Sequence, residues 1–96
     1  MNKKSIHESL KIVGEIDFHR VPELDQSIRQ FIVASDDPIL DLSQTTSSDN
    51  TGIAMLVASA SYAKKIGKKI SFKHPPKQLL DLMAAVKVDT LLPIKT

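Results

Sequence analysis

The chain has 96 residues, of which 42% are hydrophobic, 25% charged and only 4% aromatic. This size and composition predict one globular domain over residues 1–96 with an aliphatic core, and they exclude a disordered, collagen-like or coiled-coil chain. The absence of cysteine excludes disulfides, thiolate nucleophiles and cysteine-bearing zinc sites, and the three histidines are not spaced as metal ligands. We therefore expect no metal and no other cofactor.

The net charge of +2 conceals an asymmetry between the two halves of the chain. Residues 1–50 contain five Lys or Arg and nine Asp or Glu, a balance of −4, whereas residues 51–96 contain eight Lys and two Asp, a balance of +6. This distribution bears on surfaces and partners rather than on the fold. No segment approaches the roughly 18 apolar residues that a membrane span needs, and the first residues lack an apolar signal-peptide core, so we expect a cytoplasmic protein.

The first half of the chain predicts strands and one helix. We expect two short strands, over residues 5–7 and 10–16. Apolar residues then recur at helical spacing behind Pro22, which suits the first turn of a helix, and they predict a helix over residues 21–34. Residues 39–42 form a short apolar run of strand length. The apolar positions of the predicted helix are Val21, Leu24, Ile28, Phe31 and Ile32.

The second half begins with a polar stretch rich in Ser, Thr, Asp and Asn, which prefer turns and helix caps. A long apolar face follows, and Gly67 is the expected C-terminal stop of that helix. The elements predicted in this half are, in chain order, a loop at 43–50, a helix at 51–66, a strand at 68–73, a helix that begins at Pro75 and Pro76, and a short strand or packed tail at 91–94. The alternation of strands and helices predicts an α/β fold with parallel strand pairs and right-handed crossovers.

No sequence pattern of the chain indicates catalysis. The three glycines are isolated, so there is no phosphate-binding glycine loop, and no G-x-S-x-G nucleophile elbow occurs. The carboxylate pairs are better explained as solvated charges at turns and strand ends than as general acids or bases. We therefore expect a protein that is not an enzyme, and we expect no nucleic-acid partner. The carboxylate pairs are Asp36 with Asp37 and Glu15 with Asp17.

The most informative segment covers residues 48–56. Its position at the start of a predicted helix puts the Thr51 hydroxyl beside backbone N–H groups that have no partner within the helix. A phosphate on Thr51 would be stabilised by these N–H groups and by the positive end of the helix dipole, so Thr51 is a candidate phosphoacceptor. The alternative is that Asp49 or Asn50 simply caps the helix.

The same predicted helix has a second face. At 100° per residue, Thr51, Met55, Ala58 and Tyr62 lie on one line, roughly opposite the face that is expected to pack on the sheet. Methionine and tyrosine are frequent at protein interfaces, so this line predicts an exposed partner-binding stripe. The alternative is ordinary surface apolarity.

Four short segments follow one another along the chain: Gly14–Asp17, Ile39–Ser43, the turn Asp49–Gly52 and Gly67–Ile70. In this order and spacing they resemble the STAS domain, a small α/β module of anti-sigma-factor antagonists and of subunits attached to some transporters. The resemblance implies a SpoIIAA-like fold, with a mixed sheet of about four to five strands and about three to four helices packed on it.

Three further features are the short length, residues 52–56 and the segments 76–82 and 88–92. In these the chain is most similar, within this family, to the MlaB type, the cytoplasmic STAS subunit of an ABC transporter that moves phospholipids between the membranes of Gram-negative bacteria. This similarity implies a non-catalytic subunit that binds the ATPase subunit, supports its assembly and activity, and lies at the inner membrane only through the complex. The implied partner-binding residues are Asp49, Asn50, Thr51, Gly52, Met55, Ala58 and Tyr62.

The turn also departs from the usual family pattern, Asp-Ser-Ser/Thr/Ala-Gly. Asn50 occupies the first hydroxyl position, and Thr51 occupies the position that resembles the phosphoacceptor of anti-sigma-factor antagonists. This resemblance implies an alternative function: an antagonist that acts by partner switching on an anti-sigma factor kinase, with phosphorylation of Thr51 adding about two negative charges.

Overall fold

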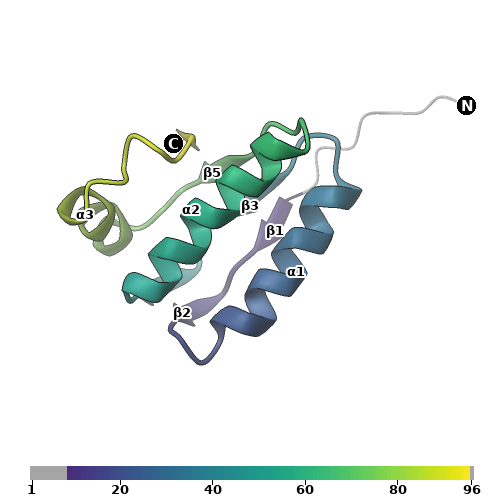
Figure 1. Ribbon diagram of the computed structural model, residues 1–96. Coiled ribbons are helices and arrows are strands. Elements are labelled where there is room, and N and C mark those ends of the chain that lie inside the picture. Colours follow the sequence, from purple (N-terminus) through teal and green to yellow (C-terminus); the bar gives the residue numbers. More distant parts are fainter. Residues whose placement is uncertain (1–8, 96) are drawn as a thin grey trace, which may run out of the picture.

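The computed structural model describes residues 9–95, in which strands and helices alternate (Figure 1). Among these residues there are six short strands and three helices. In chain order they are β1 (Ser9–Lys11), β2 (Gly14–Ile16), α1 (Val21–Ala34), β3 (Ile39–Asp41), β4 (Thr45–Ser48), α2 (Asn50–Lys65), β5 (Ser71–Lys73), α3 (Lys77–Ala85) and β6 (Ile94–Lys95). The α/β class and the SpoIIAA-like architecture are confirmed.

The strands form a four-stranded sheet in the order β1-β3-β5-β6 and a two-stranded sheet of β2 and β4. All strand pairings within residues 9–95 are parallel. The resemblance implied a mixed sheet, which would also contain an antiparallel pair. The register shifts between Gly14 and Glu15, where Gly14 has φ +88°, a value that residues with a Cβ rarely adopt. The guanidinium of Arg20 donates hydrogen bonds to the carbonyls of Val13 and Glu15 and so holds this irregularity in place.

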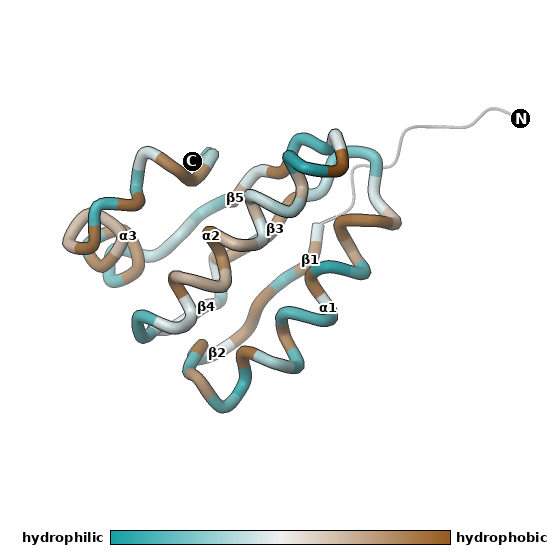
Figure 2. Tube along the Cα trace, viewed as in Figure 1, coloured by the Kyte–Doolittle hydropathy of each residue, from teal (hydrophilic) through white to brown (hydrophobic). Residues whose placement is uncertain are grey.

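Helices α1 and α2 lie side by side across the strands, and α3 lies beyond α2 (Figure 1). The bounds of α1 are those predicted, because Pro22 and the apolar spacing agree. Figure 2 shows hydrophobic residues along the middle of α2 and hydrophilic residues at both of its ends. No helix in the described part of the chain is long and apolar enough to cross a membrane.

The core is aliphatic, as the composition predicts, and Phe72 is its single aromatic member. It joins residues of the strands to one face of each helix, and all of its side chains are at most 7% exposed. Its members are Ile12, Ile16, Ile28, Ile32, Leu40, Leu42, Ile53, Met55, Leu56, Ala63, Ile70, Phe72, Leu79, Met83 and Leu92.

The prediction of a loop over residues 43–50 is wrong, because part of this segment forms strand β4, which pairs with β2. Thr45 is buried, and its hydroxyl donates a hydrogen bond to the Ile12 carbonyl at 2.6 Å, so a polar strand satisfies its own side chain inside the fold.

Other predicted boundaries also shift. The predicted strand 10–16 is divided into β1 and β2, since the chain leaves one ladder for the other at residues 12 and 13. Only the last three residues of the predicted strand 68–73 pair with β3. Helix α3 begins at Lys77, after Pro76 in an extended conformation. The predicted strand at residues 5–7 lies outside the described residues.

Candidate protein-binding site

The turn that begins α2 is organised by the Asp49 carboxylate. Asp49 is the N-cap residue, and its Oδ1 accepts hydrogen bonds from the Gly52 N–H at 3.0 Å and from the Thr51 hydroxyl at 2.5 Å. Its Oδ2 accepts the Phe18 N–H at 3.2 Å. The Thr51 hydroxyl first, and then the Gly52 N–H, hold the pKa of Asp49 below its usual value. The carboxylate is therefore ionised at neutral pH and fixes two loops to each other.

Gly52 lets α2 approach the strands closely. A Cβ at this position would meet the Ser48 hydroxyl and would lie 2.7 Å from the Ile16 side chain. The Asp49 N–H also donates to the Ile16 carbonyl at 3.1 Å. The first turn of α2 thus packs directly on the ends of β2 and β4. This close contact restricts movement of the turn relative to the strands.

Phe18 lies next to this turn, in the loop between β2 and α1, and its side chain is 60% exposed. Its ring stacks on His19 with 4.0 Å between centroids. The Asp17 carboxylate accepts the His19 N–H at 3.0 Å, and Asp49 holds the Phe18 N–H, so the backbone on both sides of the ring is fixed. Figure 1 shows this loop and the start of α2 at the same end of the molecule.

An apolar groove of about 390 Å³ continues from the turn between α2 and the residues that follow α3. Its wall contains Asn50 and Ala54 on α2, and Val86 is 41% exposed on the other side. We refer to Phe18, Asn50, Thr51, Ala54 and Val86 together as the turn surface. The other side chains that line the groove are Ile53, Val57 and Val88.

The predicted turn residues Asp49, Asn50, Thr51 and Gly52 come together at the start of α2. Thr51 and Asn50 are exposed, Asp49 is half-buried and Gly52 is buried, so the turn presents its first residues to solvent and its glycine to the strands. The expectation that Asp49 or Asn50 caps the helix is confirmed for Asp49.

The predicted exposed stripe on α2 is wrong in part. Met55 is only 4% exposed, and Tyr62 is half-buried with the guanidinium carbon of Arg29 at 4.7 Å from its ring centre. Helix α1 covers this side of α2, which the periodicity of α2 alone does not reveal. Ala58 is exposed, and the open face is rotated toward Ala54 and Ser61.

Sequence reasoning missed Phe18 and the groove. A lone aromatic side chain in a short polar connection was the available signal for Phe18, since the chain has only four aromatic residues. Among residues 9–95 no three His, Asp or Glu side chains are arranged to hold a metal ion.

The small α/β fold and the capped turn at the start of α2 agree with a STAS-type domain. The family model described as "Mlab, STAS domain" matches residues 1–93, and the chain belongs to the STAS domain family. No curated protein matches the chain in sequence.

Solved structures with the same fold include two that are described as anti-sigma factor antagonists. A Thermotoga maritima protein described as a candidate anti-sigma factor antagonist has a TM-score of 0.78 and 14% identity, over 97% of this chain and 84% of that one. SpoIIAA in its unphosphorylated form has a TM-score of 0.73 and 14% identity, over 98% and 85%. The phosphorylated form of SpoIIAA, from Bacillus, has a TM-score of 0.68 and 14% identity, over 92% and 81%. At this identity the likeness establishes the shared fold.

Proposed function

We propose that the chain is a non-catalytic STAS subunit that binds the ATPase subunit of an ABC transporter for phospholipids, in the maintenance of outer-membrane lipid asymmetry. The turn surface makes the contact, and the complex brings the chain to the inner membrane. One finding supports this choice of partner: the family model described as "Mlab, STAS domain" matches residues 1–93.

The single observation that supports protein binding most is the exposed Phe18 ring beside the Asp49 turn. Large aromatic side chains dominate binding energy at protein interfaces when they enter a pocket of the partner. The backbone around Phe18 is already fixed by Asp17 and Asp49, so binding orders little additional chain. The neighbouring groove supplies the apolar area on which a partner side chain can pack.

The chemistry of the turn supports an adaptor without a catalytic role. The hydrogen bonds from Thr51, Gly52 and Phe18 engage both oxygens of Asp49. A carboxylate with a lowered pKa is a weak general base. Asp49 therefore accepts a hydrogen bond from the Thr51 hydroxyl but is a poor base for removing its proton. The turn therefore provides a fixed shape rather than a reactive group.

Co-purification tests the proposal. The tagged chain, isolated from its own cells, is expected to recover an ABC ATPase together with its permease. Phe18→Ser is expected to lose both, whereas Val33→Ser, which changes an equally apolar side chain that is 55% exposed on the last turn of α1, retains them. Recovery of a kinase-like anti-sigma factor in place of the ATPase would contradict the proposal, as would equal loss in both variants.

A second candidate function is that of an anti-sigma-factor antagonist regulated by phosphorylation of Thr51. The observation that favours it is the exposed Thr51 hydroxyl in the first turn of α2. A phosphate there would remove the proton donated to Asp49 and would place a dianion beside that carboxylate, so the turn surface would change in both shape and charge. The fold shared with SpoIIAA, solved with and without phosphorylation, is consistent with this candidate.

Intact-mass analysis separates the two functions. After incubation with ATP and the candidate kinase, the antagonist function requires a mass shift in the wild-type chain that Thr51→Ala abolishes. An unshifted wild-type mass, with the kinase active on another substrate, excludes the antagonist function and leaves the transporter function in place.

A further inference from the structure

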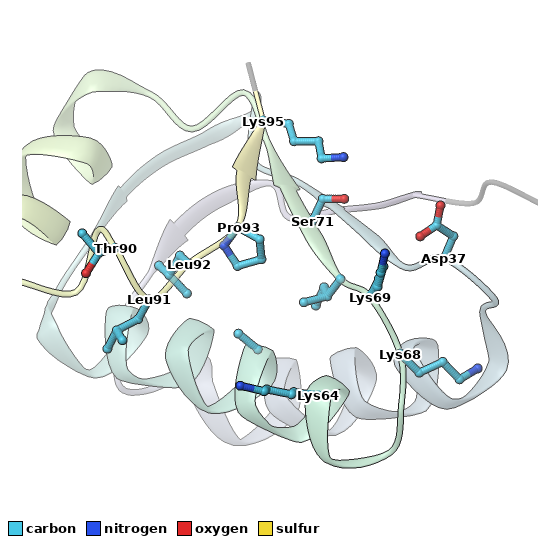
Figure 3. A pocket seen from close by; sticks show the side chains of 12 residues that line it. Asp37, Lys64, Lys68, Lys69, Ser71, Thr90, Leu91, Leu92, Pro93 and Lys95 are labelled. Atoms are coloured by element: carbon cyan, nitrogen blue, oxygen red, sulfur yellow. The ribbon is translucent and has the colours of Figure 1, made fainter.

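The opposite end of α2 forms part of a second and larger pocket, of about 690 Å³. It lies between the last turns of α2, the loop that leads into β5 and the C-terminal segment at residues 90–95 (Figure 3). The volume falls within the range of about 300–1,000 Å³ that is typical of small-molecule sites. Because α2 has 16 residues, or about 24 Å at 1.5 Å per residue, this pocket is separate from the turn surface.

The lining of this pocket is strongly basic. It contains four lysines and one carboxylate, Asp37, an excess of three positive charges. Lys68 is engaged, because its ammonium donates to the carbonyls of Ser35 and Val33, and Figure 3 shows it extending away from the C-terminal segment. The ammonium groups of the other three have no hydrogen-bond or ion-pair partner among residues 9–95. These three are Lys64, Lys69 and Lys95.

Ser71 adds a hydroxyl group to this pocket. The residue is 8% exposed and lines the pocket. A serine hydroxyl can donate one hydrogen bond, so Ser71 can contribute a donor to a ligand bound there. Figure 3 shows the Ser71 oxygen between the ends of Lys69 and Lys95.

An ordinary explanation covers only part of this arrangement. Lysines in the last turn of a helix compensate its negative dipole end, which accounts for Lys64. It does not account for Lys69, in the loop before β5, or for Lys95, on β6. Two positions that are close in sequence, Lys64 and Lys69, and the distant Lys95 thus place cations at one pocket whose lining contains a single carboxylate, Asp37.

One wall of the pocket is apolar. Leu91 is 59% exposed, and Leu92, Ile70 and Ala60 continue the wall behind it. A ligand that bears a phosphate and an apolar part would satisfy both walls at once, since the ammonium groups and the serine hydroxyl suit phosphate oxygens and the leucine covers the rest.

We propose that this lysine pocket, composed of Lys64, Lys69, Ser71, Leu91 and Lys95, binds the phosphate group of an organic phosphate. Lys69, Lys95 and the Ser71 hydroxyl hold the phosphate oxygens, Lys64 lies along the opposite wall, and the organic part packs on Leu91. The proposal goes beyond the protein contact at the other end of α2 and does not depend on it.

Two probes distinguish the sources of such a phosphate. Titration calorimetry with glycerol 3-phosphate measures binding of a soluble organic phosphate. Sedimentation with vesicles of phosphatidylglycerol and phosphatidylcholine in equal amounts, compared with phosphatidylcholine alone, measures binding of a lipid headgroup. Binding in either experiment that depends on the pocket residues supports the proposal, and which probe binds identifies the source. Absence of binding in both experiments overturns it.

Charge-matched variants separate the pocket from general electrostatic attraction. Lys69→Gln with Lys95→Gln is expected to weaken binding by about tenfold or more, because each charged hydrogen bond contributes about that factor. Lys11→Gln with Lys65→Gln removes the same charge from exposed positions that do not line the pocket, and it is expected to change binding by less than about twofold. Ser71→Ala is expected to weaken binding, with its folded state verified by circular dichroism. Equal loss in the two double variants would overturn the site.

Discussion

The two ends of helix α2 differ in whether their charged side chains have hydrogen-bond partners. At the start of the helix, the Asp49 carboxylate accepts three hydrogen bonds, and Gly52 seats the first turn on the strands. At the end of the helix, the ammonium groups of Lys64 and Lys69 have no partner among residues 9–95. The first end is therefore a fixed shape, which suits recognition of a protein, and the second is a concentration of charge, which suits a small anion.

This difference has a consequence for salt. Interactions of exposed charges are screened over about 8 Å at physiological ionic strength, whereas apolar contacts are not. We expect binding at the turn surface to depend weakly on salt and binding at the lysine pocket to fall as salt rises. The helix thus links two surfaces whose occupancy can be distinguished in solution by ionic strength alone.

The largest expected effect concerns Met55. Its substitution distinguishes a side chain that is packed in the core from one that lies on an exposed stripe of α2. Met55→Ala is expected to lower the free energy of unfolding by about 2–5 kcal/mol, because it truncates a core side chain that is only 4% exposed. Urea denaturation measures this loss. Ala58→Ser, at an exposed position of the same helix, is the control and is expected to change it by less than about 0.5 kcal/mol. Equal stability of the two variants would mean that Met55 is a surface residue.

Gly52→Ala tests the close packing of the first turn of α2 on the strands. We expect the free energy of unfolding to fall by about 1–3 kcal/mol, because the added methyl group meets Ser48 and Ile16 and forces the helix outward. Alanine favours a helix more than glycine does, so a helix without this contact would gain stability from the same change. A variant more stable than wild type in thermal unfolding would therefore refute the close approach.

Asp49→Asn tests the charge at the start of α2 through pH. The pKa of Asp49 is lowered in the folded chain, first by the Thr51 hydroxyl, so its ionisation stabilises the fold above the unfolded value of about 3.9. This contribution is lost as pH falls through the lower, folded value. We expect wild type to be more stable than Asp49→Asn at pH 7 and the difference to shrink below about pH 4. Asp41, whose pKa is lowered chiefly by the Ser43 N–H, titrates in both proteins and cancels in the comparison.

The smallest expected effect is at the other end of the helix. Lys69→Gln is expected to change the free energy of unfolding by less than about 0.5 kcal/mol, because the ammonium has no ion-pair partner among the described residues and is exposed. Chemical denaturation at low and high salt measures this. A clear destabilisation would show that Lys69 supports the fold, and the contrast between the two ends of α2 would then disappear.

The sequence predicted the elements that follow a strong periodicity or a specific turn residue. The helix at 21–34 was predicted with its observed bounds, because Pro22 marks its start and its apolar spacing is regular. Capping by Asp49 was one of two alternatives offered for this turn, since Asp and Asn are both favoured at the N-cap position, and the structure selects Asp49. The arrangement of helices packed on a sheet was predicted from the family resemblance, because no single motif indicates it.

Three features could not be predicted from local sequence. Strand β4 consists of Thr and Ser, and its pairing depends on β2, about thirty residues earlier. Met55 lies on an apolar stripe, but only the placement of α1 decides that the stripe is covered. The lysine pocket joins residues from α2, the loop before β5 and β6, and the sequence places only Lys64 to Lys69 near one another.

The turn surface is the central claim, and affinity for the ATPase subunit tests it most directly. Titration calorimetry compares wild type with Thr51→Glu, which places a second negative charge beside Asp49, and with Ser61→Glu, which adds the same charge at an exposed position farther along α2. We expect Thr51→Glu to weaken binding by about tenfold or more and Ser61→Glu to change it by less than about twofold. Unchanged affinity in Thr51→Glu, in a folded variant, would remove the start of α2 from the interface.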